Sequence, residues 1–188
     1  MLFDRLASRL VNNAPAVSGD AERKRAAVAA LLHDEPAGPR VLMMKRVVRE
    51  GDPWSGHISL PGGRFQDGDR DLLTTAIRET REELGIELAD AQLLGNLTPL
   101  HPRTSGPLGI EVTPFVFVAR AAVEPVCGPE AESAFWLPLP LAASGELDGT
   151  YIYPGSDMTF PSWTFDGHVI WGLTMRILGE LLALTRPA

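Results

Sequence analysis

The sequence predicts one α+β domain, and three observations support this. Its 188 residues are enough to bury a single hydrophobic core. Hydrophobic residues make up 45% of the chain and charged residues 22%, which are ordinary values for a globular protein. Strand-like runs lie on both sides of a helical pattern near the middle, without an internal repeat or a change of composition that would mark a second domain.

The N-terminal segment MLFDRLASRL predicts a short amphipathic helix, because its leucines and Phe3 share one face. Residues 12–22 are rich in Ala, Pro, Ser and Gly, which indicates a linker or arm. We therefore divide the chain into an N-terminal helix and arm at residues 1–22 and a single domain at residues 23–188.

Within the domain, hydrophobic runs bounded by Gly and Pro predict strands, and 3.6-residue periodicity predicts helices. The alanines of the first strand candidate would also suit a helix. Expected strands lie at 25–33, 41–46, 57–60, 91–97, 111–118 and 135–139, with a rigid turn at 61–63. Expected helices run from Asp69 or Asp71 to about Leu84, and from 171 to 184; residues 150–165 suggest irregular hairpins or loop.

Charge and cysteine content narrow the possible functions. The 17 basic and 24 acidic residues give a net charge of −7, which argues against a broad nucleic-acid or anionic-membrane surface. Cys127 is the only cysteine, so an intrachain disulfide and a cysteine-based zinc site are excluded. The N-terminal segment lacks the apolar core of a signal peptide, and we expect a cytoplasmic protein without nucleic-acid or membrane partners. The sequence also allows a homodimer.

Three glutamates cluster near the end of the central helix. At about 100° per residue, Glu82 and Glu83 lie roughly 60° and 40° to either side of Glu79. Such carboxylates repel one another and lie at the negative end of the helix dipole. A solvated acidic face neutralised by Arg78 and Arg81 is the simpler interpretation. The unfavourable placement instead indicates a divalent cation, because Mg²⁺ prefers oxygen ligands.

The segment PGGRFQDGDRDLLTTAIRETREELGI resembles the Nudix box. The usual form of the box is Gly, five residues, Glu, seven residues, then Arg-Glu-apolar-x-Glu-Glu-x-Gly-apolar. Residues 78–86 match this form except that Thr80 replaces the aliphatic residue. At the front, Gly63 and Asp69 fit best, with one extra residue before Arg78.

That longer spacing resembles the coenzyme A diphosphatase branch of the superfamily. The segments SGHISLPGG and IWGLTMRIL also resemble that branch. Two positions depart from its pattern: Val47 follows Arg46 where a serine is usual, and Trp54 stands where a histidine is expected.

The resemblance implies a mixed β-sheet sandwiched between helices (α/β/α) and hydrolysis of a nucleoside diphosphate linked to another moiety. It implies Mg²⁺ or Mn²⁺ at Glu79 and Glu83 with Glu82 nearby, and an orienting role for Arg78, although a simple salt bridge would look the same. Our preferred general base is Glu82, and the loop candidates are Glu130 and Glu132. The expected substrate contacts are Gly62, Gly63, Arg46 and His57, although the two glycines would equally suit a tight turn.

Several alternatives remain open at the level of sequence. The substrate is coenzyme A, or instead ADP-ribose, another NDP-sugar or a noncanonical nucleoside triphosphate. A catalytically silent Nudix module that senses a ligand is a different class of function, but it would be expected to lose some of the glutamates. Asp69 either folds back toward the metal site or Arg78, or caps the helix; because a helix from Asp69 to Glu79 spans about 15 Å, we expect a structural cap.

Overall fold

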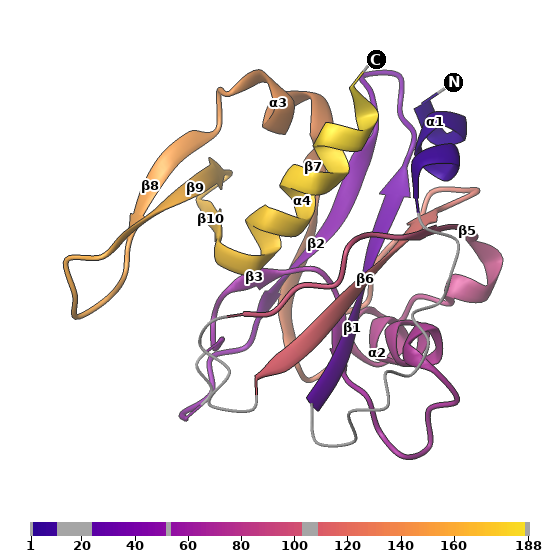
Figure 1. The fold of residues 1–188 in the computed structure, drawn as a ribbon, viewed down its shortest axis with the longest axis horizontal. Helices are drawn as coiled ribbons and strands as arrows, with labels where there is room; N and C mark the ends of the chain where they lie inside the picture. The colour runs from indigo at the N-terminus through magenta and orange to yellow at the C-terminus, as the bar shows by residue number, and fades with distance from the viewer. Residues whose placement is uncertain (1, 11–23, 52–53, 103–108, 187–188) are drawn as a thin grey trace.

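The computed structural model describes residues 2–10, 24–51, 54–102 and 109–186 (Figure 1). The arm predicted at residues 12–22 lies outside these. The helices are α1 (Leu2–Arg9), α2 (Leu72–Leu84), α3 (Leu139–Ser144) and α4 (Gly172–Thr185), with a 3-10 turn at Leu88–Asp90. The strands are β1 (Lys24–His33), β2 (Arg40–Arg46), β3 (Ile58–Ser59), β4 (Gly62–Arg64), β5 (Gln92–Asn96), β6 (Ile110–Val118), β7 (Ala131–Pro138), β8 (Asp148–Ile152), β9 (Thr159–Phe165) and β10 (His168–Trp171).

The main sheet is mixed. Its central path runs β3-β2-β1-β6-β5, while β4 pairs with β1 and β7 pairs with β2. The β1–β6 pair is parallel, from Lys24↔Ile110 to Leu32↔Val118, and the other pairs are antiparallel. Strands β1 and β2 pair only where the chain turns between them, and residues 58–64 then pair first with β2 and next with β1. This crossing segment carries the paired glycines.

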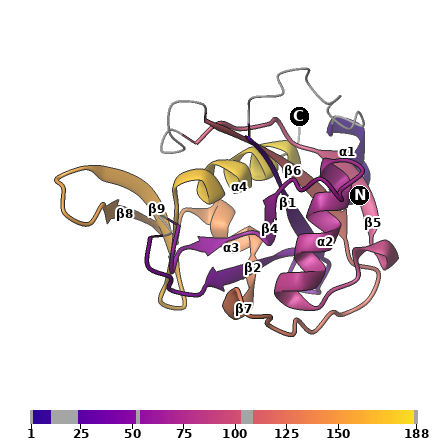
Figure 2. The same ribbon diagram turned by 90° about the horizontal axis from the view of Figure 1, so that it is seen from below.

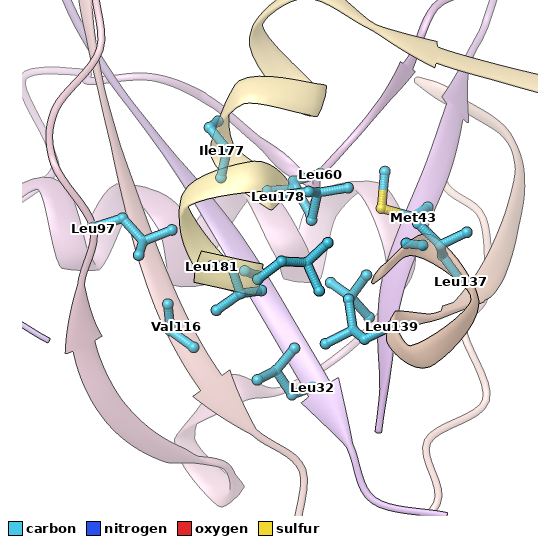
Figure 3. Packing of buried hydrophobic residues seen from close by; sticks show 14 of the residues in the cluster. Leu32, Met43, Leu60, Leu97, Val116, Leu137, Leu139, Ile177, Leu178 and Leu181 are labelled. Atoms are coloured by element: carbon cyan, nitrogen blue, oxygen red, sulfur yellow. The ribbon is translucent and has the colours of Figure 1, made fainter. Parts of the chain in front are cut away.

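Helices cover both faces of the main sheet, as predicted. Side chains of β1 alternate: Ala27, Ala29 and Leu31 pack in one core with α2, whereas Ala30 and Leu32 pack in a second core with α4. Because β1 is buried on both faces, its sequence is a nearly continuous hydrophobic run. Figure 2 shows α2 and α4 with β1 between them, and Figure 3 shows the side chains of α4 against the sheet.

Three expectations need correction. Residues 150–165, expected to form irregular hairpins or loop, lie mostly in the regular β8–β9 hairpin, which with β10 makes a separate three-stranded sheet. Aromatic and Thr residues favour strands, and cross-strand pairs such as Tyr151↔Phe160 outweigh the local Pro and Gly. Gly62 and Gly63 belong to strand β4 and not to a tight turn. The expected strand at 135–139 begins at Ala131 and gives way to α3 at Leu139.

The β8–β9 hairpin extends away from the body of the molecule (Figure 1). Its base joins the main sheet, where β10 lies beside β3 and α4 begins directly after Trp171. Among the described residues, none of the helices has the length and apolar character needed to cross a membrane.

Candidate active site

Helix α2 is fixed at both ends by its own sequence. At the N-terminus, Asp71 Oδ1 accepts hydrogen bonds from the backbone N–H and the hydroxyl of Thr74, both at 2.7 Å. At the C-terminus, Gly85 adopts a left-handed conformation with φ 65°, and its N–H donates to Arg81 O. The predicted helix is therefore confirmed, with Asp71 rather than Asp69 as its cap.

Glu83 is a nearly fully buried carboxylate. Its side chain is 2% exposed, and Oε2 accepts a hydrogen bond of 2.8 Å from the backbone N–H of Gly62. Arg46 Nη1 lies 3.8 Å from Oε1. Burial raises the pKa of Glu83 to about 8; the Gly62 bond and Arg46 oppose this shift, and the charges of Glu79 and Glu130 add to it. This position thus favours a bound proton or cation.

Arg78 connects the other acidic groups. Its Nη1 donates to Glu79 Oε1 at 2.9 Å and to Glu82 Oε2 at 3.0 Å. Its Nε and Nη2 donate to the two carboxylate oxygens of Asp69, and Nη2 also donates to the carbonyl of Arg64. One guanidinium therefore fixes three carboxylates relative to the β4 backbone.

The expectation that Asp69 caps the helix is wrong. The loop curls back before α2 begins, so that Asp69 Oδ2 accepts from Gln66 N and Thr75 Oγ1 while both oxygens accept from Arg78. The Arg78 hydrogen bonds lower the pKa of Asp69 to about 2. The sequence separation of nine residues is not a helical contact spacing, and only the curled loop brings the two side chains together.

The glycines of β4 allow α2 to approach closely. A Cβ atom on Gly63 would lie 2.5 Å from the carboxyl carbon of Glu79. A Cβ atom on Gly62 would lie 2.3 Å from Ala27 O, and Gly62 has a positive φ of 151°. Gly62 is therefore required by the packing of β4 on β1, whereas Gly63 leaves room for the Glu79 carboxylate.

Glu79 itself lies in a partly desolvated position. Burial raises its pKa, although the Arg78 hydrogen bond opposes the shift. The charges of Glu82 and Glu130 raise the pKa further. Both Glu79 and Glu83 are thus carboxylates whose negative charge is poorly solvated.

Of the two loop candidates, Glu130 is the one whose charge raises the pKa values of Glu79 and Glu83. The segment before it is anchored to the end of α2, since Val126 N donates to Leu84 O and Gly128 N donates to Glu83 O. Arg49 Nη1 holds Glu130 at 3.0 Å, a pairing that sequence reasoning missed because the two residues lie in separate loops. Glu132 instead pairs with Lys45 at 2.7 Å.

The predicted site residues therefore fall into two groups. The structure brings together Arg46, Gly62, Gly63 and the side chains of α2. The His57 ring contacts Trp171, with 5.2 Å between ring centroids, and the backbone carbonyl of His57 accepts a hydrogen bond from Arg46 N. Thr80, the departure from the box, is buried, and its hydroxyl donates to Ala76 O at 2.7 Å, so a polar side chain is satisfied in an apolar position.

The donor chemistry suits a hard divalent cation, although the ligands are not assembled. In the part of the chain that the structure describes, no group of three or more His, Cys, Asp or Glu is arranged to hold a metal ion. Arg78 holds Glu79 and Glu82, and Gly62 N holds Glu83. However, carboxylate oxygens are the ligands that Mg²⁺ prefers, and the raised pKa values of Glu79 and Glu83 reflect negative charge that a cation would relieve.

The chain is similar to known proteins in family, in sequence and in fold. The model of the NUDIX domain family matches residues 23–153. The human mitochondrial coenzyme A diphosphatase NUDT8 is 31% identical over 156 residues, which cover 79% of this chain and 64% of that protein. The Nudix hydrolase NudL of Yersinia pestis (strain Pestoides F) is 31% identical over 135 residues, covering 68% of this chain and 63% of that protein. The chain thus spans a little under two thirds of the length of these relatives.

Solved structures share the fold. The Ap4A hydrolase of C. elegans, in a binary complex, has a TM-score of 0.53 at 19% identity, covering 64% of this chain and 84% of that chain. The protein DR0079 of Deinococcus radiodurans also has a TM-score of 0.53, at 17% identity, and covers 87% of this chain and 88% of that chain. At these identities the likeness concerns the fold alone.

Proposed function

The chain belongs to the NUDIX domain family, and we propose on this basis that it hydrolyses the diphosphate bond of a nucleoside diphosphate linked to another moiety. The observation that carries the proposal is the buried Glu83, whose carboxylate is held by Gly62 N one helical turn from Glu79. Burying a carboxylate in this way is unfavourable unless a proton or a cation compensates it.

We propose that Mg²⁺ or Mn²⁺ binds at Glu79 and Glu83, with Glu82 nearby. When bound, the cation would neutralise the charge of the diphosphate and lower the pKa of a water molecule. The protein contributes the position of the ligands: Gly62 N orients Glu83, and the space left by Gly63 admits the Glu79 carboxylate. The backbone of β4 is itself fixed by pairing with β1.

Arg78 and Arg46 have separate proposed roles. Arg78 positions Glu79 and Glu82 through Nη1 while Asp69 holds the other side of its guanidinium. Arg46, with its charge beside Glu83, is suited to meet a phosphate oxygen of the substrate. Arg46 thereby provides a positive charge for an anionic diphosphate although the whole chain is acidic.

For the general base we propose Glu82. Its side chain is 52% exposed, so water can reach it, and Arg78 Nη1 fixes its orientation. Glu130 is the alternative, because its charge reaches both Glu79 and Glu83. Glu82→Gln and Glu130→Gln distinguish these roles: the base variant should lose the acid limb of the pH–rate profile, whereas the other should retain it.

We further propose coenzyme A as the substrate. Support comes from the similarity to NUDT8, which is named a coenzyme A diphosphatase, and from the Gly63–Asp69–Arg78 spacing with SGHISLPGG. ADP-ribose, other NDP-sugars and noncanonical nucleoside triphosphates are the competing substrates. A silent sensing module is disfavoured because Glu79, Glu82 and Glu83 are all present.

A substrate panel tests the proposal. Coenzyme A, ADP-ribose, an NDP-sugar and a noncanonical nucleoside triphosphate are incubated with Mg²⁺, with Mn²⁺ or with EDTA, and the phosphoryl products are separated by chromatography. We expect metal-dependent cleavage that Glu83→Gln lowers by orders of magnitude while its circular dichroism is unchanged. Glu87→Gln, at an exposed position paired with Arg81 at 3.9 Å, is the matched control. Cleavage by Glu83→Gln at the parent rate would refute the site.

A further inference from the structure

A cavity of about 350 Å³ opens where the three-stranded sheet meets the main sheet. It lies between the ends of β2 and β3 and the strands β8 and β10, outside the group of carboxylates on α2. Four of its lining residues carry flat rings and two carry opposite charges. The rings belong to His57, Tyr151, His168 and Trp171, and the charged residues are Lys45 and Asp166.

The rings are held in place by contacts with one another and with the core. Tyr151 stacks on Trp171 with 4.2 Å between centroids and 24° between planes. His57 contacts Trp171 edge-on, and His168 stacks on Phe135 at 4.3 Å and 8°. Trp171 directly precedes α4, which Thr174 ties to β3 through a 3.1 Å hydrogen bond to Ile58 O. The cavity therefore has a preformed aromatic wall.

The cavity is also a close neighbour of the proposed catalytic site. Lys45 and Arg46 are consecutive on β2, so their side chains point to opposite faces of the sheet. Arg46 approaches Glu83, whereas Lys45 lines the cavity. The backbone N–H of Arg46 donates to His57 O at 3.0 Å, and His57 lines the cavity as well. The cavity lining and Arg46, which we propose meets the phosphates, therefore share the end of β2.

We propose that this cavity binds the purine base of the substrate nucleoside. Flat aromatic side chains stack on a base face, and the volume is at the lower end of the range of small-molecule sites. Lys45, whose ammonium keeps donors beyond the one that bonds Glu132 Oε1, and Asp166 supply a donor and an acceptor for the polar edge of a base. A flexible aliphatic arm would instead gain most from aliphatic walls, and only Ile58 and Val169 are of that kind in this lining. The inference rests on the proposed function, because it assigns one half of that substrate.

Adenosine is the appropriate probe, since it carries a purine base without a phosphate. Binding is measured by isothermal titration calorimetry on the full chain in EDTA, so that neither a metal ion nor hydrolysis contributes. We expect adenosine to bind, and Trp171→Leu and Tyr151→Leu each to weaken binding roughly ten- to hundredfold, the range found for removal of one stacking side chain. Tyr153→Leu is the matched control, because Tyr153 contacts Trp171 at 5.9 Å but does not line the cavity.

Binding of adenosine and hydrolysis of a diphosphate can be lost independently, which separates this inference from the proposed function. Glu83→Gln should bind adenosine as the parent does, even when it hydrolyses no diphosphate. The inference is overturned if adenosine does not bind, if Tyr151→Leu binds it unchanged, or if 4′-phosphopantetheine binds the cavity in place of adenosine. Thermal unfolding followed by circular dichroism identifies a variant that fails to fold. Because Tyr151 lies on β8 and Trp171 ends β10, the two substitutions perturb different strands and one folded variant suffices.

Discussion

Asp69 and Arg78 form a bidentate ion pair across the start of α2, with Arg78 Nε 2.8 Å from Asp69 Oδ1 and Arg78 Nη2 2.9 Å from Asp69 Oδ2. Both partners are largely buried, with side-chain exposures of 3% and 17%. The pair fixes the plane of the guanidinium, and Nη1 then points to Glu79 and Glu82. A residue outside the helix thereby positions two carboxylates within it.

The first prediction is that Asp69→Asn weakens both stability and activity. The variant keeps a hydrogen-bonding side chain but removes the most buried of the three carboxylates paired with Arg78, so we expect the free energy of unfolding to fall by about 1–3 kcal/mol. We expect kcat to fall several-fold, and less than in Glu83→Gln, because Glu79 and Glu82 lose a rigid anchor. Urea unfolding and steady-state kinetics measure both effects.

The control for this prediction is Asp67→Asn, which changes an exposed acid in the same loop. It should leave stability and kcat at parent values. Parent-like behaviour of Asp69→Asn would mean that Arg78 holds the glutamates without help.

The second prediction separates the paired glycines. In Gly63→Ala the new methyl group meets the flexible end of Glu79, which can turn aside, so the fold should persist while metal-dependent activity falls at least tenfold. In Gly62→Ala the methyl group meets Ala27 O and Val28 Cα, which are backbone atoms, at a positive φ that Ala rarely adopts. That variant should lose several kcal/mol of stability. Thermal unfolding and activity assays of the two variants measure these effects. An equal loss of stability in both would contradict the prediction.

Much of the fold was predictable because its signals are local. The two long helices, the end of α2 at Gly85 and the strands β1, β2, β5 and β6 follow from hydrophobic periodicity and from turn residues. The three-stranded sheet was missed because its strands are short and are interrupted by Pro and Gly. Its stability comes from pairing between strands and from aromatic contacts such as Tyr151 on Trp171, which periodicity does not report.

In the candidate site, too, the contacts within one helix were predictable and the contacts between distant segments were not. The spacing of Glu79, Glu82 and Glu83 predicted a shared arc because all three lie on one helix. The partners supplied by other segments were harder to predict. Gly62 N reaches Glu83 only because β4 pairs with β1, and Asp69 reaches Arg78 only because the intervening loop curls back.

The third prediction concerns pH. The folded-state pKa of Glu83, about 8, lies above its ordinary value of 4.5, so the folded protein holds a proton that the unfolded chain has released. The free energy of unfolding of the metal-free protein should therefore fall as pH rises from about 4.5 to 8, by up to about 5 kcal/mol from this group. Urea unfolding in EDTA at several pH values measures the slope.

Glu83→Gln provides the comparison for the pH series, because glutamine stays neutral at every pH. Its unfolding free energy should depend less on pH across that window. Mg²⁺ should stabilise the parent more at pH 8 than at pH 5, since the cation competes with the proton. An identical slope in the parent and in Glu83→Gln would show that Glu83 titrates normally in the folded state.

The last prediction concerns the choice of substrate. If the Gly63–Asp69–Arg78 spacing and the similarity to NUDT8 extend to activity, coenzyme A should be split into 4′-phosphopantetheine and 3′,5′-ADP. Its kcat/KM should exceed that of ADP-ribose by roughly tenfold or more, because the two share the adenosine diphosphate and differ in the groups attached to it. Differences between these substrates then report the contacts made by the pantetheine arm and the 3′-phosphate. Dephospho-coenzyme A, which lacks the 3′-phosphate, separates the contributions of the arm and the 3′-phosphate. Activity that remains in Glu83→Gln measures contaminating hydrolase. A preference for ADP-ribose or an NDP-sugar would reject coenzyme A while leaving the metal site and the family assignment intact.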